Sequence, residues 1–94
     1  MDRFDVAIRF SDGDVWEIDA KAYRNPIALR SKIQNDGGFP SGDYARGYFV
    51  IPSEYTVNQR NYTAIINRVL KDQKNVECVT LKTLKTAIAK KEAA

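Results

Sequence analysis

Two short segments near the N-terminus alternate between apolar and polar residues, and this alternation limits the fold more than any other feature of the sequence. Residues 4–10 (FDVAIRF) place their aromatic and aliphatic side chains on one face, and residues 15–21 (VWEIDAK) alternate in the same way. A period of two is typical of a half-buried strand. Residues 11–13 (SDG) predict a three-residue hairpin loop whose glycine is left-handed. The sequence therefore predicts an antiparallel hairpin in which Ala7 faces Glu17.

Three helices are predicted from their start signals and from apolar residues at helical spacing. Asn25 and Pro26 predict the start of the first helix, Thr56 or Asn58 caps the second, and Thr80 caps the third. The apolar residues expected to face the core from these helices are Ile27, Leu29 and Ile33, then Tyr62, Ile65, Ile66, Val69 and Leu70, and finally Leu81, Leu84 and Ile88.

Two further strands alternate with these helices, which sets the fold class. Residues 48–52 (YFVIP) form a continuously apolar run, as in a buried strand, and residues 75–79 (NVECV) form another. The resulting order is ββαβαβα, in one domain spanning residues 1–94. Because strands separated by helices favour parallel crossovers, we expect an α/β layered domain whose mixed sheet opens with the hairpin and is flanked by helices.

The composition excludes several kinds of chemistry. The chain has no histidine and one cysteine, Cys78, so Cys/His zinc sites and Ser-His-Asp triads are excluded. No apolar run is long enough to span a membrane and no signal peptide is apparent, which predicts a cytoplasmic location. The net charge of +3 is small, but acids concentrate in the first nineteen residues and bases from residue 60 onward. Any catalysis would therefore use carboxylates, lysine, tyrosine or a hard metal ion.

The polar face of the hairpin carries the candidate site. In the predicted register Asp5 lies opposite Asp19, with Lys21 two residues further along the same face. Two facing carboxylates repel one another unless a cation neutralises them, and Mg²⁺ or Mn²⁺ between them would do so. Lys21 would orient a metal-bound water or neutralise charge on a phosphate. By the pattern alone, a solvated sheet face is the commoner explanation.

These residues resemble the PD-(D/E)XK nuclease superfamily of restriction endonucleases and resolvases, whose signature is an acid on one strand and (D/E)-x-K on the next. Asp5 matches the first acid, with Phe4 in place of the usual proline, and Asp19 and Lys21 match the second part. Further segments resemble restriction-endonuclease-like domains associated with prokaryotic PIWI-type defence cassettes; they are residues 20–26, residues 49–52, the helix around Tyr62 and residues 76–84. The superfamily core normally begins with a helix and a strand before the hairpin, and this chain begins at the hairpin.

The resemblance implies a metal-dependent endonuclease acting on DNA in a prokaryotic restriction or defence system, with Asp5, Asp19 and Lys21 as catalytic residues and the two aspartates as metal ligands. The alternative is a nuclease-fold domain that binds nucleic acid or a partner protein without cleaving. A third possibility is an unrelated α/β domain. An uncovered strand edge further predicts a homodimer, or a larger parent or partner protein.

Two arginines are candidate substrate contacts. Arg24 precedes the helix start, and a contact to a backbone phosphate and an ordinary surface arginine are equally good interpretations of it. Arg46 lies between Tyr44 and Tyr48, an interleaving that suits base stacking, although packing of both tyrosines is favoured. Glu17 shares the face of Asp19 and is an alternative metal ligand, although an exposed glutamate is the commoner explanation. We also expect Asp5 and Asp19 to be less exposed than the acids of the hairpin turn, because the helix after Pro26 walls the site.

Overall fold

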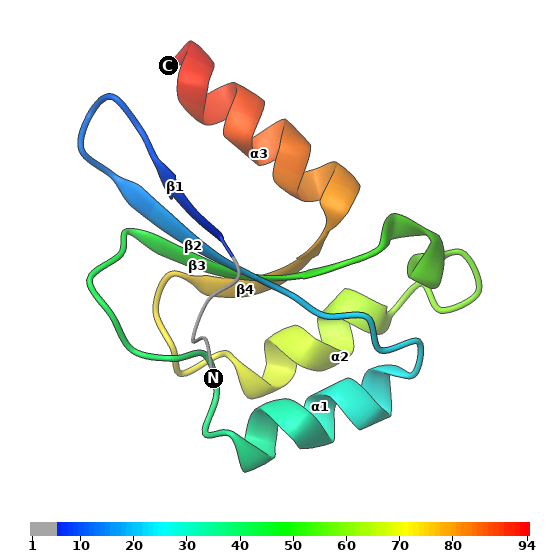
Figure 1. The fold of residues 1–94 in the computed structure, drawn as a ribbon. Coiled ribbons are helices and arrows are strands. Elements are labelled where there is room, and N and C mark those ends of the chain that lie inside the picture. The colour runs from blue at the N-terminus through cyan, green and yellow to red at the C-terminus, as the bar shows by residue number, and fades with distance from the viewer. Residues whose placement is uncertain (1–5) are drawn as a thin grey trace.

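The computed structural model describes residues 6–94 and shows a four-stranded sheet between two helical layers (Figure 1). The strands are β1 (Val6–Arg9), β2 (Val15–Ala20), β3 (Arg46–Ile51) and β4 (Val76–Thr80), and they lie side by side in that order. β1 pairs antiparallel with β2, whereas β2, β3 and β4 are parallel. The α/β class and the mixed sheet opened by a hairpin are therefore confirmed.

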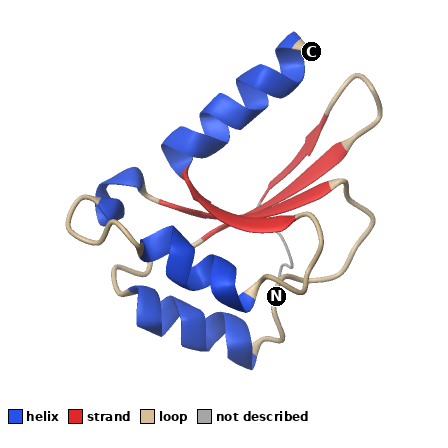
Figure 2. Cartoon of the chain, turned by 180° about the vertical axis from the view of Figure 1, so that it is seen from behind, coloured by secondary structure: helices blue, strands red, loops and turns tan. Residues whose placement is uncertain are grey.

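The helices divide unequally between the two faces of the sheet. They are α1 (Pro26–Asn35), α2 (Tyr62–Val69) and α3 (Leu81–Ala93), with a short 3-10 helix, η1 (Ser53–Thr56), between β3 and α2. α1 and α2 cover one face and α3 crosses the other (Figure 2). None of the helices in residues 6–94 is long and apolar enough to cross a membrane.

The hairpin turn has the predicted geometry. Phe10 N donates to Asp14 O at 2.9 Å, Gly13 N donates to Phe10 O at 3.0 Å, and Gly13 has a φ of +96°. Asp14 N donates to the carboxylate of Asp12 at 2.9 Å, which closes the turn. Ala7 pairs with Glu17. The expected register is therefore confirmed for the described strands.

Each face of the sheet carries its own core. Against α1 and α2 the buried residues are Leu29, Ile33, Phe39, Phe49, Ile51, Tyr62, Ile66, Leu70 and Cys78. Against α3 they are Trp16, Ile18, Tyr48, Val50, Val79 and Leu84, with Ile8, Phe10 and Ile88 packed beside them. Cys78, Trp16 and the Tyr62 stripe of α2 are thus core residues, as predicted.

Three apolar side chains expected in the core are instead exposed: Val6 at 53 %, Ile27 at 44 % and Leu81 at 44 %. Ile27 lies in the first turn of α1, on the side away from the buried Leu29 and Ile33. Val6 begins β1, at the end of that strand away from the hairpin turn, and Leu81 is the first residue of α3. The prediction for Phe4 lies outside the described residues.

Helix starts were predicted correctly where the signal is local. Asn25 Oδ1 accepts from Ile27 N at 2.8 Å, and Thr80 Oγ1 accepts from Thr83 N at 3.1 Å. The prediction for α2 was wrong, because neither Thr56 nor Asn58 caps it. Thr56 instead donates to Ser53 O at 2.8 Å within η1, and α2 begins later, at Tyr62.

Two side-chain amides bind backbone groups as a neighbouring strand would. The side chain of Asn67 in α2 makes two hydrogen bonds to the backbone of Cys78 on the outer edge of β4. Cys78 N donates to Asn67 Oδ1 at 2.7 Å, and Asn67 Nδ2 donates to Cys78 O at 3.1 Å. Gln73 binds Phe39 in the same way, at 2.7 and 3.0 Å. Asn67 therefore closes the middle of the β4 edge, where a further strand would otherwise pair.

Candidate active site

Asp19 and Lys21 lie together at the end of β2 where the parallel strands finish. Lys21 N donates to Val50 O at 2.8 Å, which extends the β2–β3 ladder past Ala20. The backbone therefore stays extended from residue 19 to residue 21, so both side chains project from the same face. The Lys21 amine lies 3.4 Å from Asp19 Oδ1.

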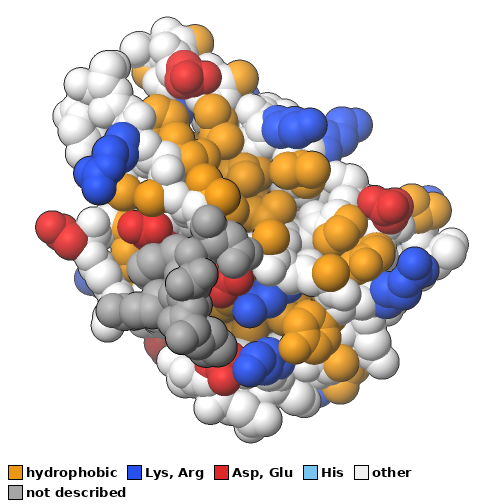
Figure 3. All heavy atoms as spheres, viewed as in Figure 1, with side chains coloured by type: hydrophobic (Ala, Val, Ile, Leu, Met, Phe, Trp, Pro, Cys, Tyr) orange, Lys and Arg blue, Asp and Glu red, His pale blue; other side chains and the backbone are white. Residues whose placement is uncertain are grey.

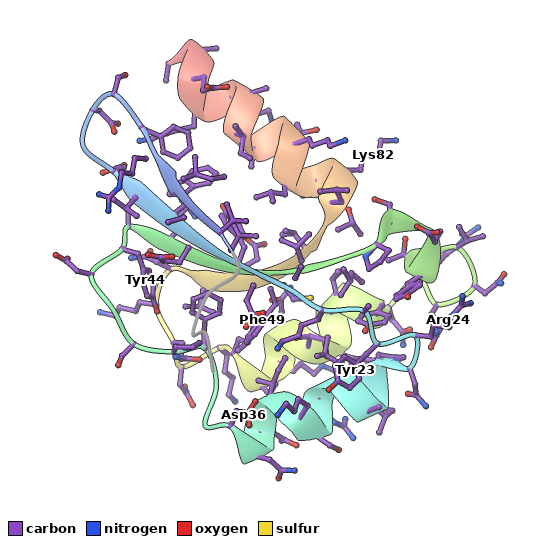
Figure 4. All side chains as sticks on the ribbon, in the orientation of Figure 1. Tyr23, Arg24, Asp36, Tyr44, Phe49 and Lys82 are labelled. Atoms are coloured by element: carbon purple, nitrogen blue, oxygen red, sulfur yellow. The ribbon has the colours of Figure 1, made fainter. Side chains whose placement is uncertain are left out.

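This ion pair is shielded from solvent. The side chain of Asp19 is 13 % exposed and that of Lys21 is 21 %, whereas the turn acids Asp12 and Asp14 are 53 % and 44 % exposed. Asp19 is adjacent to Phe49 on β3, whose ring packs into the core beneath α1 and α2 (Figure 4). The prediction that Asp19 is less exposed than the turn acids is confirmed, and it lies on the face that α1 covers.

Two hydrogen bonds hold the backbone that follows Lys21. One comes from α2 and the other from the residues that precede α2 in the chain. Tyr62, fully buried in α2, donates its hydroxyl to Tyr23 O, and Gln59 Nε2 donates to Arg24 O at 2.8 Å. Burial raises the pKa of Tyr62 to about 12, so the phenol remains a donor at physiological pH. The sequence identified Tyr62 only as a core residue, because its hydroxyl partner lies 39 residues away.

Arg24 reaches the same end of the sheet as Lys21 (Figure 4). Its side chain is exposed, and its guanidinium lies 5.6 Å from the centre of the Tyr55 ring. A cation over an aromatic face is held in place without losing its charge. Arg24 is therefore held in solvent against Tyr55, three residues after Lys21 in the chain, and its role as a phosphate contact stays a prediction.

Arg46 is not brought to this site. It begins β3 beside Trp16, on the face covered by α3, and lines a pocket of about 510 Å³ with Tyr48 and Lys90. Asp19 lies three residues further along β2, which is about 10 Å at the usual rise of a strand, and its side chain points to the opposite face. Any substrate contact by Arg46 is thus separate from the Asp19–Lys21 pair.

The two tyrosines near Arg46, Tyr44 and Tyr48, pack against other side chains, which is the interpretation that the sequence favoured. Tyr44 stacks edge-on against Phe39, with ring centres 5.6 Å apart, and its hydroxyl donates to Pro40 O at 2.9 Å. Tyr48 is buried against α3, and this burial raises its pKa. Neither ring is free to stack on a base.

The donor set for a metal is incomplete within the described part of the chain. In residues 6–94, no three Asp, Glu, Cys or His side chains gather in one place. Asp19 supplies one shielded carboxylate, and Glu17 lies on the same face but pairs across to Ala7. The predicted second ligand, Asp5, lies outside the described residues. The described residues therefore offer a metal ion one carboxylate ligand, Asp19, with the amine of Lys21 beside it.

The pocket nearest to Lys21 was not apparent from the sequence. It has a volume of about 350 Å³ and lies where β2 and β3 end and α3 begins. Its lining includes Ala20, Lys21, Val50, Pro52 and Leu81. The connections after β3 and β4 leave on opposite faces of the sheet, and such a divergence opens a crevice at the carboxyl ends of the strands. Only the tertiary arrangement places these segments together.

Comparison with known proteins identifies the family. A family model described as "REase associating with pPIWI_RE" matches residues 1–94. No curated protein and no solved structure matches the chain. With the layered sheet, the opening hairpin and the shielded Asp19–Lys21 pair in place, the match over the whole chain shows that it belongs to the family of restriction-endonuclease-like proteins associating with pPIWI_RE.

Proposed function

We propose that this chain is a PD-(D/E)XK-type endonuclease that hydrolyses DNA phosphodiesters with Mg²⁺ or Mn²⁺, in a prokaryotic defence system together with a PIWI-type protein. The observation that carries the proposal is the shielded pair of Asp19 and Lys21, 3.4 Å apart on one face of β2. The family description, which names both a REase and an associated pPIWI_RE, supports the reaction class and the partner.

Asp19, together with Asp5, would hold the metal ion. When bound, the ion lowers the pKa of a coordinated water and stabilises charge on the phosphate. Lys21 keeps a cationic amine beside the carboxylate, and the Lys21 N to Val50 O hydrogen bond fixes its backbone. That amine would orient the attacking water or neutralise the developing negative charge. Arg24, exposed at the same end of the sheet, would hold a flanking phosphate.

The test is cleavage of plasmid and linear DNA in Mg²⁺ or Mn²⁺ by the chain and its Asp19→Asn and Lys21→Ala variants. Removal of a group that stabilises transition-state charge lowers the rate roughly 10²–10³-fold, and we expect a loss of that size for each. The matched control is Lys32→Ala, which breaks the exposed Lys32–Asp36 pair elsewhere on the surface and should leave the rate unchanged. Cleavage that survives both site substitutions would refute the proposal.

A second candidate is a nuclease-fold module that binds nucleic acid or a partner without cleaving. The observation in its favour is the direct Asp19–Lys21 ion pair, which already satisfies the carboxylate without a metal. Calorimetric titration with Mg²⁺ separates the two functions. Metal binding that Asp19→Asn and Asp5→Ala each abolish supports the nuclease, whereas DNA affinity without metal binding supports the module.

A further inference from the structure

The sheet face beneath α3 is only partly covered. Within residues 6–94, two helices pack side by side on the opposite face, whereas α3 alone crosses this one (Figures 1 and 2). Four strands about 4.8 Å apart are wider than a single helix, whose diameter with side chains is about 10 Å. α3 runs from the end of β4 toward the hairpin turn, where Lys91 contacts Asp12 and Asp14. This diagonal path leaves the corner where β1 begins and β2 and β3 end without a helix.

Apolar side chains are exposed at this corner. Val6 and Leu81, 53 % and 44 % exposed, lie at its two sides, and Ala20, Pro52 and the largely buried Val50, 6 % exposed, line the pocket between them. We call these five residues the apolar corner. They are contiguous across the sheet, because Val6 pairs with Ile18, two residues from Ala20, and Ala20 pairs with Val50. Figure 3 shows hydrophobic side chains gathered on this face between α3 and the sheet.

The first turn of α3 is attached to η1, and the α3 side of the corner is basic. Lys82 N donates to Ser53 Oγ at 3.0 Å, which fixes the first turn of α3 against η1. Lys82 projects from that turn (Figure 4), and Lys85 lies one turn beyond Leu81 on the same side of the helix. Both lysines are exposed, and neither forms an ion pair with a residue in 6–94. The charged residues that line the pocket itself are one acid, Glu54, and one base, Lys21 of the candidate active site.

We propose that the apolar corner is the docking surface for the associated PIWI-type protein, and that its occupant is an amphipathic helix with apolar residues at helical spacing and acidic residues facing Lys82 and Lys85. This inference rests on the partner named in the proposed function. A helix of ordinary diameter fits the gap beside α3 and would complete the two-helix cover that the opposite face already has. Its carboxylates would offset the unpaired lysines.

Other occupants fit less well. A second copy docking through the same corner would form a two-fold symmetric interface, which would bring Lys82 and Lys85 of one copy close to the same lysines of the other. Nucleic acid would meet mainly carbon from Ala20, Val50, Pro52 and Leu81 in the pocket, with Lys21 and Ser53 as polar partners, and the Glu54 carboxylate would repel its phosphates. An exposed apolar surface with charged residues at its edge is typical of a protein interaction site.

Binding to the purified pPIWI_RE protein of the same organism tests the inference, with dissociation constants measured by calorimetry. We expect Leu81→Asp to weaken binding at least tenfold and Lys85→Glu to weaken it severalfold. The matched controls are Val57→Asp, an apolar residue 68 % exposed outside the corner, and Lys90→Glu, which lines the pocket on the other side of α3. Both controls should bind like the natural chain. Circular dichroism verifies that each variant is folded, which the exposure of Leu81 favours.

The outcomes separate this inference from the nuclease proposal. Asp19→Asn should abolish cleavage and retain full binding, whereas Leu81→Asp should lose binding. If the natural chain and Leu81→Asp bind equally well, or if the natural chain does not bind at all, the docking surface is wrong and the cleavage result stands by itself. If binding depends on Leu81 but no variant cleaves, the nuclease proposal fails and the docking surface stands. A dimer of the chain alone that Leu81→Asp converts to a monomer would identify a second copy as the occupant and overturn the proposal.

Discussion

The amide of Asn67 closes the outer edge of β4, and its replacement by alanine measures how much that closure stabilises the protein. Asn67→Ala removes both hydrogen bonds to Cys78, at 2.7 and 3.1 Å. Cys78 is 1 % exposed, so its N–H and C=O lose their partners in a largely dry position. A lost hydrogen bond costs about 0.5–1.5 kcal/mol, and a buried group left unsatisfied costs about 1–3 kcal/mol. Because water can reach a strand edge in part, we expect a loss of about 2–3 kcal/mol in the free energy of unfolding.

For a domain of this size, that loss corresponds to a decrease in Tm of roughly 10–20 °C. The measurement is urea unfolding followed by circular dichroism, with a thermal scan of the same samples. The control is Asn58→Ala, which changes an exposed asparagine that makes none of the hydrogen bonds found in residues 6–94. Asn67→Asp is the second variant. It keeps an acceptor for Cys78 N but turns a carboxylate toward Cys78 O, so it should be at least as destabilising.

A loss below about 0.5 kcal/mol for Asn67→Ala, within the range of ordinary surface substitutions, would refute this reasoning. It would mean that water replaces the amide without cost and that the β4 edge needs no closure. Under our account the variant should also aggregate more readily on warming than Asn58→Ala does, because an opened edge is a template for pairing with other chains.

Three further predictions test other parts of the fold. Gly47→Ala should destabilise by about 1–3 kcal/mol in urea unfolding, the usual cost of overpacking, because its Cβ would lie 2.6 Å from the Phe39 ring; a neutral result would mean that the ring moves aside freely. Cys78, whose burial raises its thiol pKa to about 12, should resist alkylation at pH 8 until urea unfolds the chain, and labelling of the folded protein would contradict its core position. Hydrogen bonding from Lys91 lowers the pKa of Asp12 below its ordinary value of 3.8. The contribution of Asp12 to stability is therefore present above pH 3.8 and is lost as the pH falls through the lowered pKa of the folded state. Lys91→Ala should weaken the pH dependence of unfolding below pH 4, and an unchanged profile would refute the coupling.

The parts of the fold that were predicted correctly depend on neighbouring residues in the chain. Alternation and a three-residue loop determine the register that pairs Ala7 with Glu17. The caps at Asn25 and Thr80 each bond a backbone N–H two or three residues away, so the signal is local. The same alternation places Asp19 and Lys21 on one face, as the structure shows.

The incorrect predictions concern which surfaces the folded chain covers. Val6, Ile27 and Leu81 have the periodicity of core residues, but burial depends on where a distant helix lies, and periodicity does not report that. Arg46 was predicted as a substrate contact from its interleaving with Tyr44 and Tyr48, and that prediction stays untested; its place at the start of β3, on the α3 face, follows from parallel pairing across 30 residues of sequence. Side-chain-to-backbone hydrogen bonds over long separations leave no pattern in the sequence.

The contact between Lys91 and the hairpin turn has a consequence for the order in which the chain folds during synthesis. Lys91 Nζ lies 2.6 Å from Asp12 Oδ2 and from Asp14 Oδ2, and 5.6 Å from the centre of the Phe10 ring. The turn is translated 77 residues before the lysine that holds it, an interval of about 4 to 15 seconds at ordinary elongation rates of roughly 5–20 residues per second. The nascent hairpin lacks its parallel neighbour β3 until residue 51 has been added, and it lacks a complete α3 for the whole interval, so its edges are open to pairing with other nascent chains. Until Lys91 is made, Asp12 and Asp14 keep their negative charge without this partner, and charged side chains at a strand edge oppose such pairing.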